Sequence, residues 1–146
     1  IATNNLLHKN AGYLFYGASS SCEEVFDRVL IEALEKPVTY VVRGGPTLND
    51  ATIEDALAAG VDGVAEIIDN GARVPGTVLS ECSAAFRQRF WDADLILAKG
   101  MGNYETLSEV DAPICFLLQV KCPVIGADIG AAAGRAVVKL VGQPAS

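Results

Sequence analysis

The stretch "VTYVVRGGPTLNDATIEDALAAG", residues 38 to 60, contains one strand-turn-helix unit in order. Residues 38–43 are β-branched or aromatic up to the final Arg43, which predicts a buried strand. Gly44, Gly45 and Pro46 predict a turn, because glycine permits backbone conformations that other residues avoid and proline stiffens the exit. Residues 51–60 have apolar residues at helical spacing and predict a short helix that ends at Gly60.

The same alternation continues in both directions from this unit. Helices are predicted at 23–36 and 76–93, and the first of them is expected to bury an apolar face made of Val25, Phe26, Val29, Leu30, Ile31 and Leu34. Strands are predicted at 12–18, 64–69, 95–100, 114–119, 122–130 and 135–140. Alternation of this kind is typical of an α/β fold with a mostly parallel sheet. The length of 146 residues and the absence of a linker predict one globular domain, 1–146.

Composition and charge exclude several classes of partner. The formal net charge is −7 and the sequence pI is about 4.6, so no basic surface is expected for nucleic acid or an anionic membrane. No apolar run reaches the roughly 20 residues that span a bilayer, and no signal peptide is recognisable, which favours a cytoplasmic location. The first residue is Ile1, so we expect the chain to be part of a longer protein. Nothing in the sequence predicts an oligomeric state.

The cysteines and the single histidine limit the kinds of active site that the sequence can form. The cysteines Cys22, Cys82, Cys115 and Cys122 form no C-x-x-C pair and are expected to be structural thiols. With His8 as the only histidine, a Ser-His-Asp triad and a histidine-rich metal site are disfavoured.

Polar and small residues follow three of the predicted strands. Asn49 and Asp50 could belong either to a helix N-cap, with Asp50 or Thr52 accepting backbone N–H groups, or to a metal or phosphate site. Residues 17–24, "GASSSCEE", leave a similar choice between a serine cap and an anion-binding turn. Lys99 ends an apolar strand and precedes a glycine-rich turn, "KGMGNYE", which favours a bound phosphate.

Several separated motifs together resemble one known family. They are "VFDRVLIEAL", "VVRGGPTLNDATIEDA", "PGTVLSECSAAF", "ADLILAKGMGNYETL" and "FLLQVKCPVI", in family order from about Tyr13 to Ile125. They are similar to the damage-control phosphatases, formerly the domain of unknown function 89. Members of that family normally have a helical region before the first strand, which this sequence does not contain.

The resemblance implies a three-layer α/β/α Rossmann-like domain that hydrolyses small phosphate monoesters, sugar phosphates or damaged phosphometabolites, with one divalent cation (Mn²⁺, Co²⁺, Ni²⁺ or Mg²⁺). It implies that Asp50 of the N-D-x-T motif, with Asn49 beside it, binds the metal, and that Lys99 faces the substrate phosphate. Asp50 and Lys99 would then be the catalytic residues. The glycines of the two turns leave the backbone accessible and are expected to bind substrate together with Lys99 and Asn103; they are Gly44, Gly45, Gly100 and Gly102.

One family motif is altered in this chain. The D-N-A-G-E metal motif falls on "SSSCE", so Ser19 and Ser20 stand at the metal positions, Cys22 replaces glycine, and only Glu23, expected near the substrate, agrees. A neutral hydroxyl is a much poorer ligand for a hard cation than a carboxylate. Two functions therefore stay open: a metal-dependent phosphatase, or a non-catalytic relative that binds a phosphorylated metabolite or a protein partner. A purely structural domain is a third alternative, but it does not explain Asp50 and Lys99.

Overall fold

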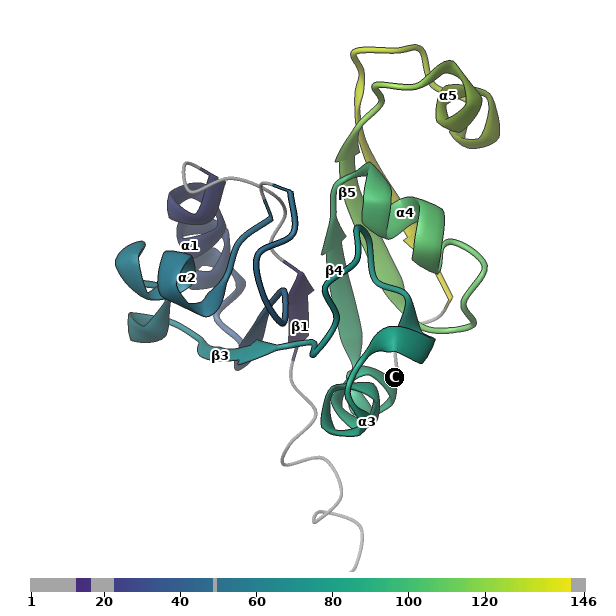
Figure 1. The fold of residues 1–146 in the computed structure, drawn as a ribbon. Coiled ribbons are helices and arrows are strands. Elements are labelled where there is room, and N and C mark those ends of the chain that lie inside the picture. Colours follow the sequence, from purple (N-terminus) through teal and green to yellow (C-terminus); the bar gives the residue numbers. More distant parts are fainter. Residues whose placement is uncertain (1–12, 17–22, 49, 143–146) are drawn as a thin grey trace, which may run out of the picture.

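A six-stranded sheet organises the chain, in the strand order β3-β2-β1-β4-β5-β6 (Figure 1). The computed structural model describes residues 13–16, 23–48 and 50–142. The strands are β1 (Tyr13–Tyr16), β2 (Val38–Val42), β3 (Glu66–Asp69), β4 (Leu95–Lys99), β5 (Ile114–Gln119) and β6 (Ala136–Val141). All neighbouring strands are parallel except β6, which is antiparallel to β5.

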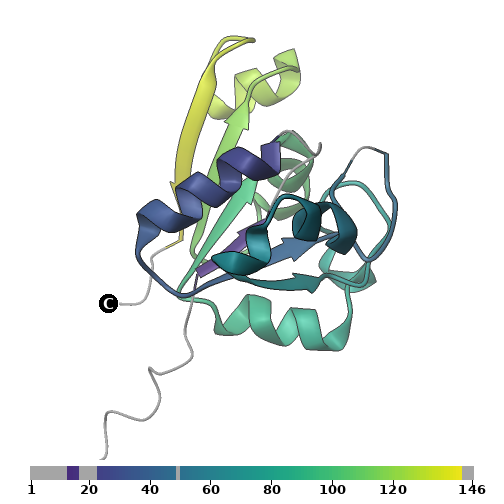
Figure 2. The ribbon, with the colours of Figure 1, turned by 90° about the vertical axis from the view of Figure 1, so that its left-hand side faces the viewer.

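Helices cover both faces of this sheet. They are α1 (Glu23–Leu34), α2 (Ile53–Ala58), α3 (Ala84–Asp92), α4 (Met101–Leu107) and α5 (Pro123–Ile129), with short 3₁₀ turns η1 (Val61–Gly63) and η2 (Leu79–Glu81). Figures 1 and 2 show α1 and α2 on one side of the sheet and α3 and α4 on the other. Among the described residues, no helix has the length and apolar character needed to cross a bilayer.

The core consists of two clusters of buried side chains, one on each face. Successive residues of a strand point to opposite faces of a sheet. Tyr40 and Val42 of β2 accordingly join the cluster under α1 and α2, whereas Val41 between them joins the cluster under α3 and α4. The prediction of a mixed α/β fold with a mostly parallel sheet is therefore confirmed.

Two predicted elements are wrong. Residues 76–93 do not form one helix, because Ser83 caps a new helix by accepting a hydrogen bond from the Phe86 backbone N–H at 3.1 Å, so that α3 begins at Ala84. Residues 122–130 form the helix α5 instead of a strand. Pro123 occupies the first turn of α5, where its missing N–H and fixed φ are tolerated, and Gly130 ends the helix in a left-handed conformation.

The predicted apolar face of α1 is also partly wrong. Ile31 is buried, but Phe26 and Val29 are 74% and 61% exposed and Leu30 also faces solvent. The residue that accompanies Ile31 into the interior is Asp27, four positions earlier on the same helical face, with 2% exposure. A buried carboxylate requires partners, and these lie at the edge of the sheet described next.

Candidate functional site

The carboxyl ends of the parallel strands meet at one edge of the sheet. β1 pairs with β2 on one side and with β4 on the other, so the strand order reverses between β1 and β4. Open α/β sheets bind ligands at such a reversal, beyond the carboxyl ends of the strands. The segment that follows β2 and the end of β4 both lie at this edge, and they contain Asp50 and Lys99.

Asp50 is not the cap of α2. Thr52 occupies the N-cap position, and its backbone N–H and its hydroxyl both donate to Asp55 Oδ2, at 2.9 and 2.8 Å. Asp50 Oδ2 instead accepts a hydrogen bond of 2.7 Å from Arg43 Nε. The Arg43 and Asp50 side chains are only 8% and 17% exposed, so this is a largely buried ion pair. The cap interpretation thus applies to Thr52 and does not account for Asp50.

Gly44 and Gly45 are needed for close packing and not for unusual backbone angles, which corrects the sequence-based reason. Neither glycine has a positive φ, and among the described residues of this loop Leu48 is the one that does. A Cβ on Gly44 would lie 2.5 Å from the backbone carbon of Gly71, and one on Gly45 would lie 2.7 Å from Arg73 Nε. The loop after β3 therefore packs directly on the turn after β2, and Arg73 extends over Gly45.

A chain of hydrogen bonds connects the Asp50 side to the Lys99 side of this edge. Arg43, which binds Asp50, also donates from a terminal guanidinium nitrogen to Thr77 Oγ1, at 3.4 Å. The Thr77 hydroxyl donates to Asn103 Oδ1 at 2.8 Å, and Asn103 Nδ2 donates to the Lys99 carbonyl oxygen at 2.8 Å. Thr77 and Asn103 are buried. Both ends of the Asn103 amide are thus bound within the protein, which makes Asn103 a support for the turn at Lys99 and Gly100.

The Lys99 ammonium is held by an acidic residue of α1. Lys99 Nζ lies 2.5 Å from Asp27 Oδ1, and the hydroxyl of Tyr40 donates to the other carboxylate oxygen, Asp27 Oδ2, at 2.9 Å. Lys99 is 19% exposed, whereas Asp27 is 2% exposed. The ammonium therefore lies at the boundary between the buried carboxylate and the surface of the sheet edge.

Further cations lie at the rim of this edge. Arg73 is exposed beside Gly45, and Lys121 is exposed shortly after the end of β5. The Lys121 backbone N–H donates to the sulfur of Met101, the first residue of α4. Nearby, Asn70 Oδ1 accepts from the Gly44 and Ala72 backbone N–H groups, while Asn70 Nδ2 is buried without a hydrogen-bond partner among the described residues.

The structure describes only some of the predicted site residues. Asp50, Lys99, Asn103 and the glycines Gly44, Gly45, Gly100 and Gly102 lie at the carboxyl edge. Ser19, Ser20, Cys22 and Asn49 lie outside the described residues, as does the side chain of Glu23, whose backbone begins α1. Within the described part of the chain, no group of three His, Cys, Asp or Glu side chains is arranged to hold a metal ion.

Sequence reasoning missed three residues of this network: Asp27, Arg43 and Thr77. Asp27 had a signal, since a carboxylate four residues before Ile31 interrupts the apolar face of a helix. Arg43 had a weaker one, because it directly follows a buried strand. Thr77 had none, because only the packing of the 75–78 segment on α4 brings it to Asn103.

The described cysteines have the properties of structural thiols. Cys82, Cys115 and Cys122 form no disulfide. Burial raises the pKa of the Cys82 thiol and of the Cys115 thiol above the ordinary value. A raised pKa keeps the thiol protonated near neutral pH, and a protonated thiol is a poor nucleophile.

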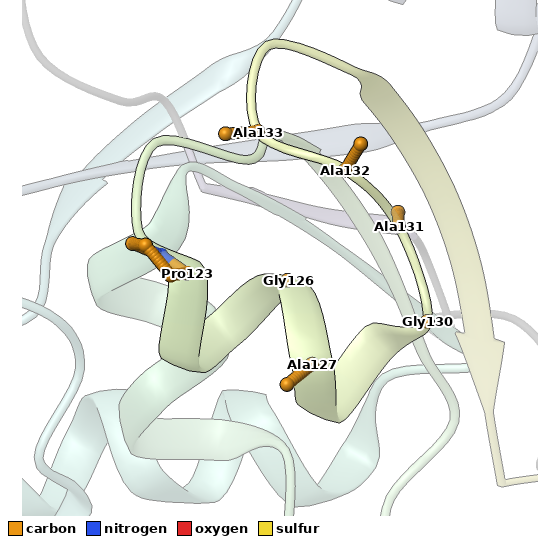
Figure 3. Close-up of a pocket in the computed structure, with 7 residues that line it drawn as sticks. All are labelled: Pro123, Gly126, Ala127, Gly130, Ala131, Ala132 and Ala133. Carbon is orange, nitrogen blue, oxygen red and sulfur yellow. The ribbon is translucent and has the colours of Figure 1, made fainter.

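The hollow beside α5 offers no comparable chemistry. It is lined by Pro123, Gly126, Ala127, Gly130, Ala131, Ala132 and Ala133 (Figure 3). None of these residues carries a charged or hydrogen-bonding side chain, so the polar network at the sheet edge is the stronger candidate for the functional site.

Comparison with known proteins places these features in a family context. The family model described as the damage-control phosphatase ARMT1-like domain matches residues 2–137. The chain is 43% identical to an uncharacterized protein of Methanocaldococcus jannaschii over 142 residues, which cover 92% of this chain and 47% of that protein. It is 40% identical to a damage-control phosphatase of Archaeoglobus fulgidus over 144 residues, which cover 95% of this chain and 50% of that protein.

The solved structures include a relative as well. The crystal structure of a DUF89 family protein from Pyrococcus horikoshii matches with a TM-score of 0.83 and 34% sequence identity. This match covers 92% of the present chain and 48% of the other. The chain thus spans about half the length of the relatives that it matches.

Proposed function

We propose that this chain, which belongs to the damage-control phosphatase ARMT1-like domain family, contributes the active site of a metal-dependent phosphatase for small phosphate monoesters. The observation that supports this most directly is the hydrogen-bond chain from Asp50 through Arg43, Thr77 and Asn103 to Lys99. It holds the expected metal ligand and the expected phosphate-facing lysine in one framework at the strand-order reversal. Sugar phosphates and damaged phosphometabolites are the proposed substrates.

The charge of the network supports a requirement for a cation. Among the described residues, Arg43 pairs with Asp50 and Lys99 pairs with Asp27, so these four side chains together carry no net charge. A phosphate monoester carries about −1.5 to −2 charges at neutral pH. A divalent cation would supply the opposite charge that the paired side chains do not.

The described residues fit such a cation in part. Asp50 offers a carboxylate at the expected position, and oxygen ligands of this kind suit hard divalent cations. The remaining expected ligands, Ser19, Ser20 and Asn49, lie outside the described residues. Asp50 would hold the cation, and the cation would polarise a phosphoryl oxygen as a Lewis acid.

The chain's own residues would then act by position and charge. Lys99 would bind a phosphoryl oxygen and stabilise the charge that develops there, an effect that is strong in a partly buried site. Arg73 and Lys121 at the rim would attract the anionic substrate. Asn103, whose amide is bound to Thr77 and to the Lys99 carbonyl, would keep the turn after β4 in place.

The proposed fold is the three-layer Rossmann-like arrangement expected from the sequence. Its support is the strand order with its reversal between β1 and β4, together with the two core clusters on opposite faces of the sheet. A single domain over 1–146 and a cytoplasmic location stay predictions.

The proposal is tested by metal binding followed by turnover. Calorimetry with Mn²⁺, Co²⁺, Ni²⁺ and Mg²⁺ should detect binding that Asp50→Ala abolishes, and the metal that binds should support hydrolysis of sugar phosphates. Asp62→Ala is the matched control, since it removes an exposed carboxylate of η1. Restoring the family motif with Ser19→Asp and Ser20→Asn should raise the turnover. Metal binding that is unchanged in Asp50→Ala would refute the proposed site.

A second function is favoured by one specific observation. Arg43 Nε already neutralises Asp50 at 2.7 Å, as a site without a metal would require. Together with Ser19 and Ser20 in place of the family's Asp and Asn, this fits a non-catalytic relative that binds a phosphorylated metabolite or a protein partner. Binding of sugar phosphates that is equally tight with and without divalent cations, and without turnover, would support this alternative.

A further inference from the structure

We propose that Asp27 is a positioning residue that, together with Tyr40, fixes the ammonium group of Lys99 at the site. The part that Lys99 plays in phosphate chemistry rests on the proposed function, whereas its fixation by Asp27 does not. Asp27 would act through Lys99 and would touch neither substrate nor metal.

The geometry restrains the carboxylate at both oxygens. Asp27 Oδ1 lies 2.5 Å from Lys99 Nζ, and Oδ2 accepts the Tyr40 hydroxyl at 2.9 Å. Tyr40 is fully buried and Asp27 is 2% exposed, so both side chains lie in the close-packed interior. A carboxylate that is held at both ends presents Oδ1 in one orientation and thereby defines the position of the ammonium.

Three elements converge on this contact. Asp27 belongs to α1, Tyr40 to β2 and Lys99 to β4, and β2 and β4 are the two neighbours of β1 in the sheet. Asp27 lies on the second turn of α1, so it ties the beginning of that helix to the end of β4. It therefore fixes Lys99 relative to the two strands that flank β1.

Stability alone gives a weak reason for this ion pair. Removing two charges from water costs free energy, and the attraction between the charges often does not exceed that cost. Apolar side chains of similar size frequently give a protein the same stability as a buried ion pair. A lysine side chain has many rotamers, whereas an ammonium that must meet a transition state has to occupy one place. Asp27 supplies that restraint, whereas an apolar residue at the same position would not restrain the Lys99 ammonium.

The inference predicts that the loss of the Asp27 charge lowers kcat without raising KM. Asp27→Asn keeps the shape but removes the charge that holds Lys99, so kcat for a phosphate monoester should fall at least about tenfold. KM should stay the same or fall, because the substrate phosphate no longer competes with Asp27 for the ammonium. Tyr40→Phe, a milder variant, should lower kcat less. In a Lys99→Ala background, Asp27→Asn should change kcat little further, because its target is gone.

The fold offers a matched control for both variants. The Tyr104 hydroxyl donates to Asp128 Oδ2 at 2.5 Å and accepts from Lys139 Nζ at 2.8 Å, which repeats the combination of Tyr, Asp and Lys among α4, α5 and β6. Asp128→Asn and Tyr104→Phe should leave kcat and KM unchanged. A kcat for Asp27→Asn within about twofold of the parent protein would overturn the inference, as would an equal loss in the Lys99→Ala background.

A second measurement decides the inference even if the protein hydrolyses no phosphate ester. Reductive methylation followed by mass spectrometry gives the labelling rate of each lysine in the folded chain, with exposed Lys36 as the internal reference. Lys99 should be labelled several times faster in Asp27→Asn than in the parent protein, and the Asp128→Asn control should leave the Lys99 rate unchanged. Equal Lys99 rates in Asp27→Asn and the parent would refute the positioning role, while absent phosphatase activity alone would refute only the proposed function.

Discussion

At the scale of single residues, the chemistry of this chain depends on whether the Asp50 carboxylate serves Arg43 or a metal ion. Arg43 occupies one of its oxygens at 2.7 Å, and both side chains are largely buried. A metal ion would have to compete with this guanidinium or accept a ligand whose charge is already neutralised. Arg43 is therefore the residue that separates the two proposed functions most directly.

Replacing Arg43 gives a prediction at this scale. Arg43→Gln removes the positive charge beside Asp50, so Mn²⁺ affinity measured by calorimetry should rise at least about tenfold, since charges about 4 Å apart interact by roughly 1–4 kcal/mol near a protein surface. Arg28→Gln is the control, because Arg28 forms an exposed ion pair with Glu32 on α1. Unchanged Mn²⁺ binding in Arg43→Gln would indicate that Asp50 is not a metal ligand.

At the scale of elements, the start of α2 determines how the loop containing Asp50 ends. Thr52 caps the helix and shares two hydrogen bonds with Asp55. Thr52→Ala should lower the free energy of unfolding by about 1 kcal/mol in urea titrations. Thr39→Ala removes a hydroxyl that donates to Glu66, a side chain that is about half exposed. The loss of this hydrogen bond should lower the free energy of unfolding by less. A smaller loss for Thr52→Ala than for Thr39→Ala would contradict the capping role.

The same cap makes the stability of the chain depend on pH. Hydrogen bonds from the Thr52 backbone and hydroxyl hold the pKa of Asp55 below its ordinary value of 3.8. A depressed pKa stabilises the folded state fully above the unfolded value, and this contribution is lost as the pH falls through the folded pKa. In Asp55→Asn, the melting temperature should therefore fall less steeply than in the parent protein as the pH drops below about 4. A slope identical to that of the parent would refute this.

At the scale of the whole molecule, close contact between distant segments keeps the site together. Gly76 follows β3 in the chain but packs on α4, where a Cβ would lie 2.5 Å from the Gly102 carbonyl oxygen, and its φ is 71°. The neighbouring Thr77 connects Arg43 to Asn103. The 75–78 segment is thus the bridge between the turn after β2 and the turn after β4.

Gly76→Ala should test this bridge. Both the left-handed conformation and the clash oppose a side chain, so the free energy of unfolding should fall by more than about 2 kcal/mol. Gly130→Ala separates the two effects, because Gly130 has a similar φ of 77° with no atom within 4 Å of its added Cβ. It should cost only about 1–2 kcal/mol. Equal losses in the two variants, measured by urea unfolding, would mean that the contact with α4 contributes nothing.

Much of this protein was determined by short-range patterns in the sequence. The β-branched runs and helical periodicities predicted the α/β class and the mostly parallel sheet, because alternation with periods of 2 and 3.6 residues reflects which face is buried. The separated motifs predicted the family, and the ends of the apolar strands predicted Asp50 and Lys99 as the residues to examine. Each of these inferences required only neighbouring residues or their order along the chain.

Tertiary structure alone decided the partners of those residues. Asp27 and Lys99 are 72 positions apart, and Thr77 and Asn103 are 26 apart, so no local pattern relates them. The sequence also failed where local propensity was ambiguous, at the apolar face of α1 and at residues 122–130. Which side of a helix is buried and which carboxylate meets which cation are settled when the sheet forms, because only then do α1, β2 and β4 lie together and the cost of burying a charge select its partner.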